Sequence, residues 1–367
     1  MPYYNDIELT RKCFFMHMAD ALVAPAVAAT MYAASAATAG VSVHKLRKDD
    51  ATDKLPAMAV MSALVFAGQM INYTIPGTGS SGHLCGGMML TGVLGPWAGF
   101  LSMIVILAIQ CLFFADGGLL ALGANVWNMA FYGCFVGYFL IYRPIMKSKW
   151  FAGMGTKDAT RLKIIIASVV GCVVTLQLGA FSVVIETSVS GITELPFGAF
   201  CAIMQPIHLA IGLIEGVITS AVLLFVYEAR PELLPDAEHG GAETGKASLK
   251  TTIVILAVVV AIVGGGLSLI ASGNPDGLEW SMFGNAEAGY SDNMGLDEDS
   301  FGVASSAADK AGAIQESTSI LPDYAFAGNP DNPAGTTVSG LVGSAAVAGI
   351  ALLVCLAGGF FRKKVKQ

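Results

Sequence analysis

Three histidines and one glutamate lie inside or beside long apolar stretches, where ionisable side chains are rare. They are His17, His83, His208 and Glu215. A charged group at the centre of a bilayer costs on the order of 3 kcal/mol unless it faces a cavity or a partner, so these positions are candidate sites. Histidine is the commonest metal ligand in proteins. For each histidine the residues alone leave two interpretations open, metal ligation or a hydrogen bond between helices.

Other polar residues accompany these histidines and are candidates to support or gate a site. His208 and Glu215 are seven residues apart, so they share one helix face and either line a cavity or contact a neighbouring helix. The remaining candidates are Asp20, Asp116, Asn125 and Gln177.

The composition indicates a polytopic membrane protein of the all-α class. The chain of 367 residues is 54% hydrophobic and only 13% charged, far from the roughly 25% charged residues of ordinary soluble domains. Apolar runs of about 18 residues or more recur along it, as crossing a bilayer requires. We expect helices over residues 19–43, 56–72, 84–94, 96–114, 119–142, 162–185, 197–227, 251–271 and 338–361.

A stretch rich in Pro, Gly and charge, residues 230–250, divides the chain into seven helices and two. We therefore expect an N-terminal extension (1–15), a seven-helix module (16–229), a cytoplasmic linker (230–250) and a two-helix module (251–367). The short, Gly-rich third helix is expected to be half-inserted or closely packed. The outer segment 272–337 either attracts cations through its acidic residues or is a solvated loop with disordered stretches such as 297–319.

Basic residues predict the orientation. Of the 20 Lys and Arg, 17 fall on one side if all nine helices cross and the N-terminus is outside. Positive residues in short loops stay cytoplasmic. We expect a multi-pass protein of the cell membrane, surrounded by lipid, with a cytoplasmic C-terminus and no nucleic-acid partner.

The sequence "GGAETGKA", residues 240–247, nearly spells a phosphate-binding loop. Such a loop needs Ser or Thr after the Lys and a strand before the glycines, and neither is present. We expect no ATP to be bound by this chain.

Four segments together resemble one family of membrane proteins. They are "MHMADALVAPAVAATMYAASAA", "IPGTGSSGHLCGGMMLTGVLGPWAGF", "LFFADGGLLALGANVWNM" and "QPIHLAIGLIEGVIT". They resemble the CbiM/NikM family, the substrate-binding subunits of energy-coupling-factor cobalt and nickel importers. The segment "NPDGLEWS" and the helices around it resemble the PDGLE-type N component, here fused to the first module.

The resemblance implies a metal site and a set of partners. Its ligands would be the amino nitrogen of Met16, the backbone and ring nitrogens of His17 and the ring of His83, holding Ni²⁺ or Co²⁺ as transported substrate. Nitrogen ligands in a square-planar field suit Ni(II), but the sequence does not decide between the two metals. The implied partners are a membrane T component and two cytoplasmic ATPases. The N component is expected to assist metal loading.

The chain departs from the family in one respect, because fifteen residues precede Met16. Either the functional chain begins at Met16, which we favour, or the site is altered and relies on His17, His83 and sulfur ligands. The expected function is uptake of Ni²⁺ or Co²⁺, not catalysis. Two rivals remain, a self-sufficient secondary transporter and a metalloenzyme that uses His17, His83 and Glu215 around zinc. No HExxH motif supports the latter.

Overall fold

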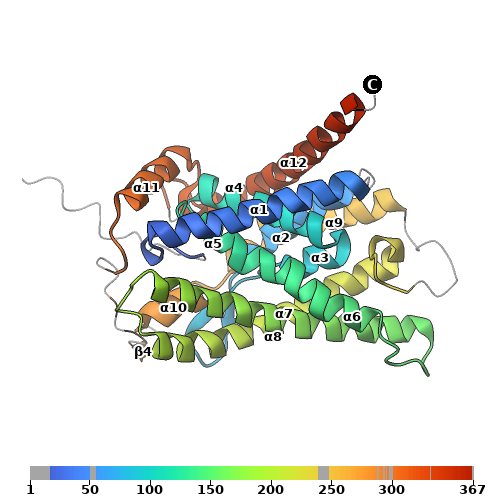
Figure 1. Cartoon of the computed structure of the whole chain (residues 1–367), viewed down its shortest axis with the longest axis horizontal. Coiled ribbons are helices and arrows are strands. Elements are labelled where there is room, and N and C mark those ends of the chain that lie inside the picture. Colours follow the sequence, from blue (N-terminus) through green and yellow to red (C-terminus); the bar gives the residue numbers. More distant parts are fainter. Residues whose placement is uncertain are drawn as a thin grey trace, which may run out of the picture.

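Long helices, packed side by side, form most of the molecule (Figure 1). The computed structural model describes residues 17–49, 55–238, 248–286, 289–291, 294, 296, 301–330 and 332–365. Within these ranges, seven helices are long and apolar enough to cross a bilayer. The predicted all-α, polytopic membrane fold is therefore confirmed.

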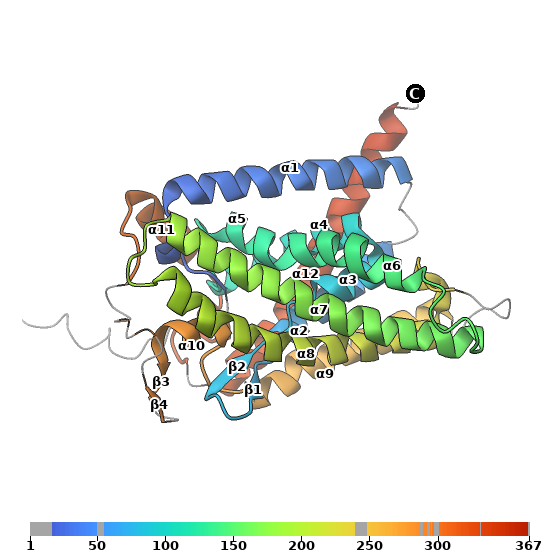
Figure 2. The same ribbon diagram turned by 60° about the horizontal axis from the view of Figure 1, so that its bottom comes forward.

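The first module contains the elements up to residue 229. Helix α1 runs along an outer side of the bundle (Figure 2). The helices α5, η3 and α6 follow one another without a break and act as one long helix. The elements are η1 (Asp20–Leu22), α1 (Pro25–Asp49), α2 (Leu55–Gln69), β1 (Tyr73–Ile75), β2 (Ser80–Gly82), α3 (Gly87–Leu94), α4 (Pro96–Phe114), α5 (Leu122–Asn125), the π-helix η3 (Val126–Tyr142), α6 (Arg143–Met146), α7 (Thr156–Val189) and α8 (Phe197–Ala229).

Each of the nine predicted helices is present, but not all of them can cross. Helix α3 has eight residues, all buried, and at 1.5 Å per residue it covers about 12 Å of a hydrocarbon core about 30 Å thick. The expectation that all nine cross is therefore wrong for α3, which packs inside the bundle, and α2, with 15 residues, is also shorter than the seven possible spans. Glycines permit this close packing, because a Cβ on Gly133 of η3 would lie 3.0 Å from the Cα of Gly87. The interpretation of this Gly-rich helix as closely packed is confirmed.

Helix α7 begins six residues earlier than predicted, at Thr156 rather than Leu162. Its first turns carry charged residues, which a hydropathy criterion assigns to a loop. These residues are paired instead, since Lys157 and Arg161 both contact the carboxylate of Glu228 on α8.

The second module packs directly on the first. Helices α9 and α12 contact α2, and α12 also contacts α4. Backbone hydrogen bonds add to this contact: Ser272 donates to Asn72, and Val303 donates to Ala21. The elements are η4 (Pro231–Leu233) in the linker, then α9 (Leu249–Gly265), η5 (Leu267–Ile270), α10 (Gly277–Phe283), β3 (Gly284–Asn285), β4 (Tyr290–Ser291), α11 (Ser306–Thr318), η6 (Pro322–Tyr324) and α12 (Pro333–Val365).

The segment 297–319 is not wholly disordered, contrary to one of the two interpretations above. Residues 306–318 form helix α11, and the side chain of Ser305 caps it by accepting the N–H of Ala308. The side chain of Gln315 donates to the carbonyl of Gly117, which joins α11 to the first module. Residues 297–300 lie outside the described part.

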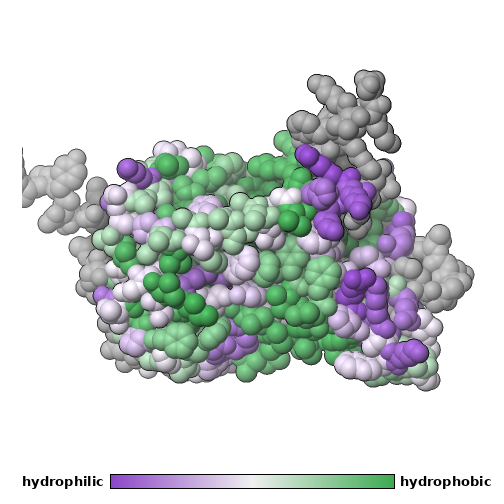
Figure 3. Space-filling view, in the orientation of Figure 1, coloured by the Kyte–Doolittle hydropathy of each residue, from purple (hydrophilic) through white to green (hydrophobic). Residues whose placement is uncertain are grey.

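The basic segments lie at one end of the bundle. This end gathers the last turn of α1, helix α6, the start of α7, the end of α8 and the start of α9 (Figure 1). Hydrophilic residues are dense there, and an apolar band follows (Figure 3). The first part of the linker is fixed to this end, since Asp236 pairs with Arg143 and Lys147. Residues 239–247, which include the sequence like a phosphate-binding loop, lie outside the described part.

Candidate metal site

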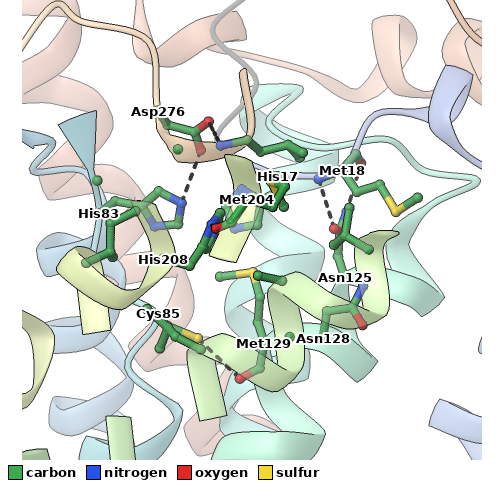
Figure 4. A pocket seen from close by; sticks show the side chains of 18 residues that line it. His17, Met18, His83, Cys85, Asn125, Asn128, Met129, Met204, His208 and Asp276 are labelled. Carbon is green, nitrogen blue, oxygen red and sulfur yellow. Dashed lines mark hydrogen bonds and ion pairs between the residues drawn. The ribbon is translucent and has the colours of Figure 1, made fainter. Parts of the chain in front are cut away.

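A buried pocket lies between the two modules (Figure 4). Helix α10, which contributes to its lining, lies at the end of the bundle opposite the basic residues (Figure 1). The cavity of the pocket is about 100 Å³, well above the roughly 10–15 Å³ that a single water requires. The lining comes from the segment before η1, from the end of β2 and the turn after it, and from α5, η3, α7, α8 and α10. The pocket thus has room for an ion and several ligand atoms.

Three imidazoles line this pocket, His17, His83 and His208. Each has its Nδ1 atom directed at an oxygen that can only accept a hydrogen bond. For His17 this is a carboxylate oxygen of Asp116 at 2.9 Å, for His83 the carbonyl of Leu84 at 3.1 Å, and for His208 the carbonyl of Met204 at 2.8 Å. In each ring Nδ1 is thus held by a fixed oxygen, and Nε2 is the nitrogen left to take up a proton or a metal. A metal ligand needs a lone pair on such a nitrogen.

His17 and His83 are brought together from positions 66 residues apart. Their ring centroids are 5.4 Å apart, and two imidazoles on one metal, each bound at about 2 Å, have centroids roughly 4–6 Å apart. His17 is only 3% exposed, and its Nε2 atom is buried without a partner among the described residues. A buried polar atom of this kind calls for an explanation. A bound ion would supply one.

Asp116 fixes the ring of His17 through the contact between its carboxylate and Nδ1. Its second carboxylate oxygen accepts a hydrogen bond from the hydroxyl of Tyr324, at 2.6 Å. Burial by itself raises the pKa of Asp116, but the His17 ring and the Tyr324 hydroxyl lower it below its usual value. The arrangement is a carboxylate–histidine pair, which fixes the tautomer and the orientation of a ligating ring.

Asn125 and Asp20 fix the backbone around His17. The side chain of Asn125 both accepts from the N–H and donates to the carbonyl of Met18, each at 3.0 Å. Asp20 accepts the N–H of Ala121 at 3.0 Å, and burial raises the pKa of its carboxyl group. Asn125 lines the pocket, and Asp20 is not among the lining residues.

A hairpin and a buried glutamate place His83. Strands β1 and β2 pair antiparallel, with Tyr73 opposite Gly82. The turn that follows is held from α8, where Glu215 accepts the backbone N–H groups of Cys85 and Gly86. Gly86 has a φ of +82°, a left-handed conformation that favours glycine. Glu215 therefore supports the turn and does not line the pocket.

The sequence reasoning missed several residues of the pocket. Asp276, in the "NPDGLE" segment of the second module, lies beside His83, with its Oδ2 atom 3.6 Å from Nε2. The motif itself was recognised, but nothing in its spacing connected it with His83. The lining residues that carry sulfur were also missed: Met18, Cys85, Met129 and Met204.

Some predicted site residues lie elsewhere. Met16 lies outside the described residues. The side chain of Gln177 on α7 donates to the carbonyl of Gln205 on α8, and the side chain of Gln205 donates to the carbonyl of Gln177. Gln177 is not part of the pocket lining. Within the described ranges, no group of three or more His, Cys, Asp and Glu side chains is arranged to hold a metal ion.

Fold and site together define a multi-pass α-helical membrane protein with a buried, imidazole-lined pocket between two fused modules. Comparison with known families agrees. Residues 17–233 match the family described as "Cobalt uptake substrate-specific transmembrane region" (CbiM), and residues 250–358 match the PDGLE domain. The chain belongs to the CbiM family and carries a C-terminal PDGLE domain.

Named relatives share this organisation. A protein of Archaeoglobus fulgidus, assigned as a fused nickel transport protein NikMN, is 34% identical over 90% of this chain and 95% of its own length. The fused nickel transport protein NikMN of Rhodobacter capsulatus is 31% identical over 92% of this chain and 96% of its own. The cobalt transport protein CbiM of Sorangium cellulosum is 30% identical over 60% of this chain and 94% of its own. The first module thus has relatives that lack the second.

Proposed function

We propose that this chain is the substrate-binding subunit of an importer for Ni²⁺ or Co²⁺. The observation that carries the proposal is the meeting of His17 and His83 in a buried pocket, with ring centroids 5.4 Å apart. Each ring is held at Nδ1 by a fixed oxygen, the carboxylate of Asp116 for His17 and the carbonyl of Leu84 for His83. Imidazole nitrogens suit divalent metals of the later first row.

The ligand set that the family resemblance implies is Met16, His17 and His83. Ligation through the His17 Nε2 atom needs no rearrangement of the ring. A chelate closed by the His17 amide nitrogen must use Nδ1 instead, since Nε2 is on the far side of the ring. That chelate requires the ring to leave Asp116, which now holds Nδ1 at 2.9 Å. The two modes therefore differ in which ring nitrogen of His17 binds the metal, Nε2 or Nδ1.

The proposed importer is of the energy-coupling-factor type, so the chain is a transporter subunit and not an enzyme. A membrane T component and two cytoplasmic ATPases would supply the energy, and ATP would bind to them. The end with the basic segments would be cytoplasmic, with the pocket near the outer face. Family membership and the names of the relatives support this proposal.

Metal binding tests the first part. We expect the purified full chain to bind about one Ni²⁺ or Co²⁺, and His83→Ala to lower the affinity at least tenfold. His44→Ala is the matched control, since His44 is exposed on α1 and is not part of the pocket lining. A wild-type chain that binds neither metal, or a His44 variant as defective as the His83 variant, would refute the proposed site.

Uptake into vesicles tests the second part. Vesicles that contain the chain with the T component and the ATPases should accumulate Ni²⁺ or Co²⁺ only with ATP. Vesicles that contain the chain alone should not accumulate either metal. Accumulation by the chain alone, abolished by an uncoupler, would instead establish a secondary transporter.

A further inference from the structure

The C-terminal module holds the end of α4 and the loop after it. Helix α11 packs against α4 and η1 (Figure 1). Just after α11, the backbone N–H groups of Ile320 and Leu321 both donate to the carbonyl of Phe113, at 3.0 and 3.1 Å. The side chain of Gln315 donates to the carbonyl of Gly117, at 2.6 Å. The second module therefore fixes this loop on both sides of Asp116.

Tyr324 of η6 contacts the same loop with its ring and with its hydroxyl. The ring stacks on that of Phe114, with centroids 4.8 Å apart and an angle of 16° between the planes. The hydroxyl donates to Oδ2 of Asp116 at 2.6 Å. The other oxygen of this carboxylate, Oδ1, lies 2.9 Å from Nδ1 of His17. One carboxylate thus separates Tyr324 from a residue of the proposed metal site.

The hydroxyl of Tyr324 keeps the carboxylate of Asp116 from turning. Asp116 is only 4% exposed, so little water can replace a lost contact. Without the hydroxyl, Oδ2 would be a buried acceptor that has lost its donor, and such a group is costly. A carboxylate that turns to find another donor moves Oδ1 away from the ring of His17. Groups that orient a ligating imidazole typically change metal affinity by about 10- to 100-fold.

A second series of polar side chains leads from Tyr324 toward His83. Gln110 lies near the hydroxyl: burial raises the pKa of Tyr324, and a hydrogen bond from Gln110 lowers it. Gln110 also donates to Oε1 of Gln69 at 2.9 Å, and Gln69 donates to the carbonyl of Cys85 at 2.9 Å. Both glutamines are fully buried. Because Cys85 belongs to the turn that carries His83 and lines the pocket, the series connects the supports of the two histidines.

We infer that Tyr324 is a positioning residue of the metal site, whose hydroxyl fixes Asp116, and thereby the ring of His17, and joins this support to the turn of His83. The inference rests on the proposed function, because it requires His17 and His83 to bind the transported metal. It assigns the C-terminal module a part in the geometry of the site, through a residue that acts by way of Asp116.

Tyr324→Phe tests the inference, because it removes the hydroxyl and keeps the ring that stacks on Phe114. In the purified full chain we expect Ni²⁺ affinity to fall about tenfold. The absorption bands of bound Co²⁺, which depend on ligand geometry, should shift as well. Tyr132→Phe is the matched control, since it removes a hydroxyl that pairs with Ser182 between η3 and α7. This control should change neither the affinity nor the Co²⁺ spectrum.

A double-mutant cycle tests whether Tyr324 acts through Asp116. In an Asp116→Ala background the hydroxyl has no carboxylate to fix, so Tyr324→Phe should lower Ni²⁺ affinity by less than about twofold. A role in general stability would give the same loss in both backgrounds. Gln69→Leu interrupts the series of side chains near His83, and we expect it to lower Ni²⁺ affinity about threefold or more.

Two results would overturn the inference. One is wild-type affinity together with a wild-type Co²⁺ spectrum in Tyr324→Phe, and the other is a tenfold loss that persists in the Asp116→Ala background. Wild-type affinity in Gln69→Leu would overturn the connection to His83. A wild-type chain that binds neither Ni²⁺ nor Co²⁺ would instead refute the proposed function.

Discussion

Glu215 holds Gly86 by a hydrogen bond that crosses the bundle, from the backbone N–H of Gly86 to Oε1 at 2.9 Å. The other oxygen of Glu215 accepts the N–H of Cys85, also at 2.9 Å. These N–H groups precede helix α3 and have no partner within it. A carboxylate that is 1% exposed thereby fixes the turn that presents His83. Glu215 is thus part of the support of the pocket, although it lies outside its lining.

Removal of the Glu215 carboxylate should therefore affect stability and metal binding together. Glu215→Ala leaves two buried N–H groups without an acceptor, at about 1–3 kcal/mol each. Glu215→Gln keeps one acceptor and should cost about half as much. Thermal unfolding in detergent and Ni²⁺ titration measure the two effects. Glu194→Ala, at an exposed loop position, should change neither, and an unaltered Glu215→Ala protein would contradict this role.

Asn125 should be needed for the geometry at His17. Its side chain makes both hydrogen bonds to the backbone of Met18, the residue that follows His17. Asn125→Ala loses both, and we expect a loss of about 1–3 kcal/mol in stability together with a tenfold or greater loss of Ni²⁺ affinity. Asn125→Asp keeps the acceptor and should be intermediate.

Gln177→Ala is the matched control for Asn125. Gln177 also donates an amide hydrogen bond to a backbone carbonyl, that of Gln205, but it lies outside the pocket lining. It should lower stability without a change in Ni²⁺ affinity beyond about twofold. Equal losses of affinity in the two variants would show that Asn125 acts only through general stability.

Much of the fold could be predicted from the sequence, because long apolar runs and their charged breaks report directly on membrane helices. Hydropathy fails where helices leave the bilayer or do not cross it. At the start of α7, pairing with Glu228 stabilises charged helical turns. In α3, the eight buried residues are mostly apolar but too few to span the bilayer.

The site was predictable only in part. His17 and His83 were recognisable because histidine is rare in apolar surroundings, and the structure brings them together. Asp276 is different, since a carboxylate in an acidic outer segment looks like a solvated charge. Its position depends on long-range contacts such as the hydrogen bond from Ser81 to Pro275, almost 200 residues apart in the chain. No local pattern contains that information.

The pH dependence of stability should reveal that the ionised carboxylate of Asp20 is destabilised by burial. Burial raises the pKa of its carboxyl group above the usual value, so the folded state binds the proton more tightly than the unfolded state. Stability then falls as pH rises from about 4, the unfolded value, through the folded-state pKa. Asp20→Asn keeps an oxygen that can accept from Ala121. It should unfold at a higher temperature than wild type at pH 7, with the difference vanishing below about pH 4.

Thermal unfolding of metal-free protein across this pH range checks the prediction. Asp309→Asn, at an exposed site on α11, should follow the wild-type curve. If Asp20→Asn unfolds at a lower temperature than wild type at pH 7, the ionised carboxylate of Asp20 stabilises the fold and the expected sign is wrong.

The contact between Gly133 and Gly87 should tolerate no side chain, because the backbones of η3 and α3 touch there. A Cβ on Gly133 would lie 3.0 Å from the Cα and 3.2 Å from the carbonyl carbon of Gly87, and these are backbone atoms that cannot rotate away. Helix α3 follows the turn of His83, so a displaced α3 also moves that ring. We expect Gly133→Ala to cost about 1–3 kcal/mol, as overpacking usually does, and to weaken Ni²⁺ binding. Gly40→Ala, with nothing within 4 Å of the added Cβ, should be neutral or stabilise α1 by up to about 1 kcal/mol. The unfolding temperatures of the two variants test this prediction. Similar values would mean that η3 and α3 can move apart without a loss of stability.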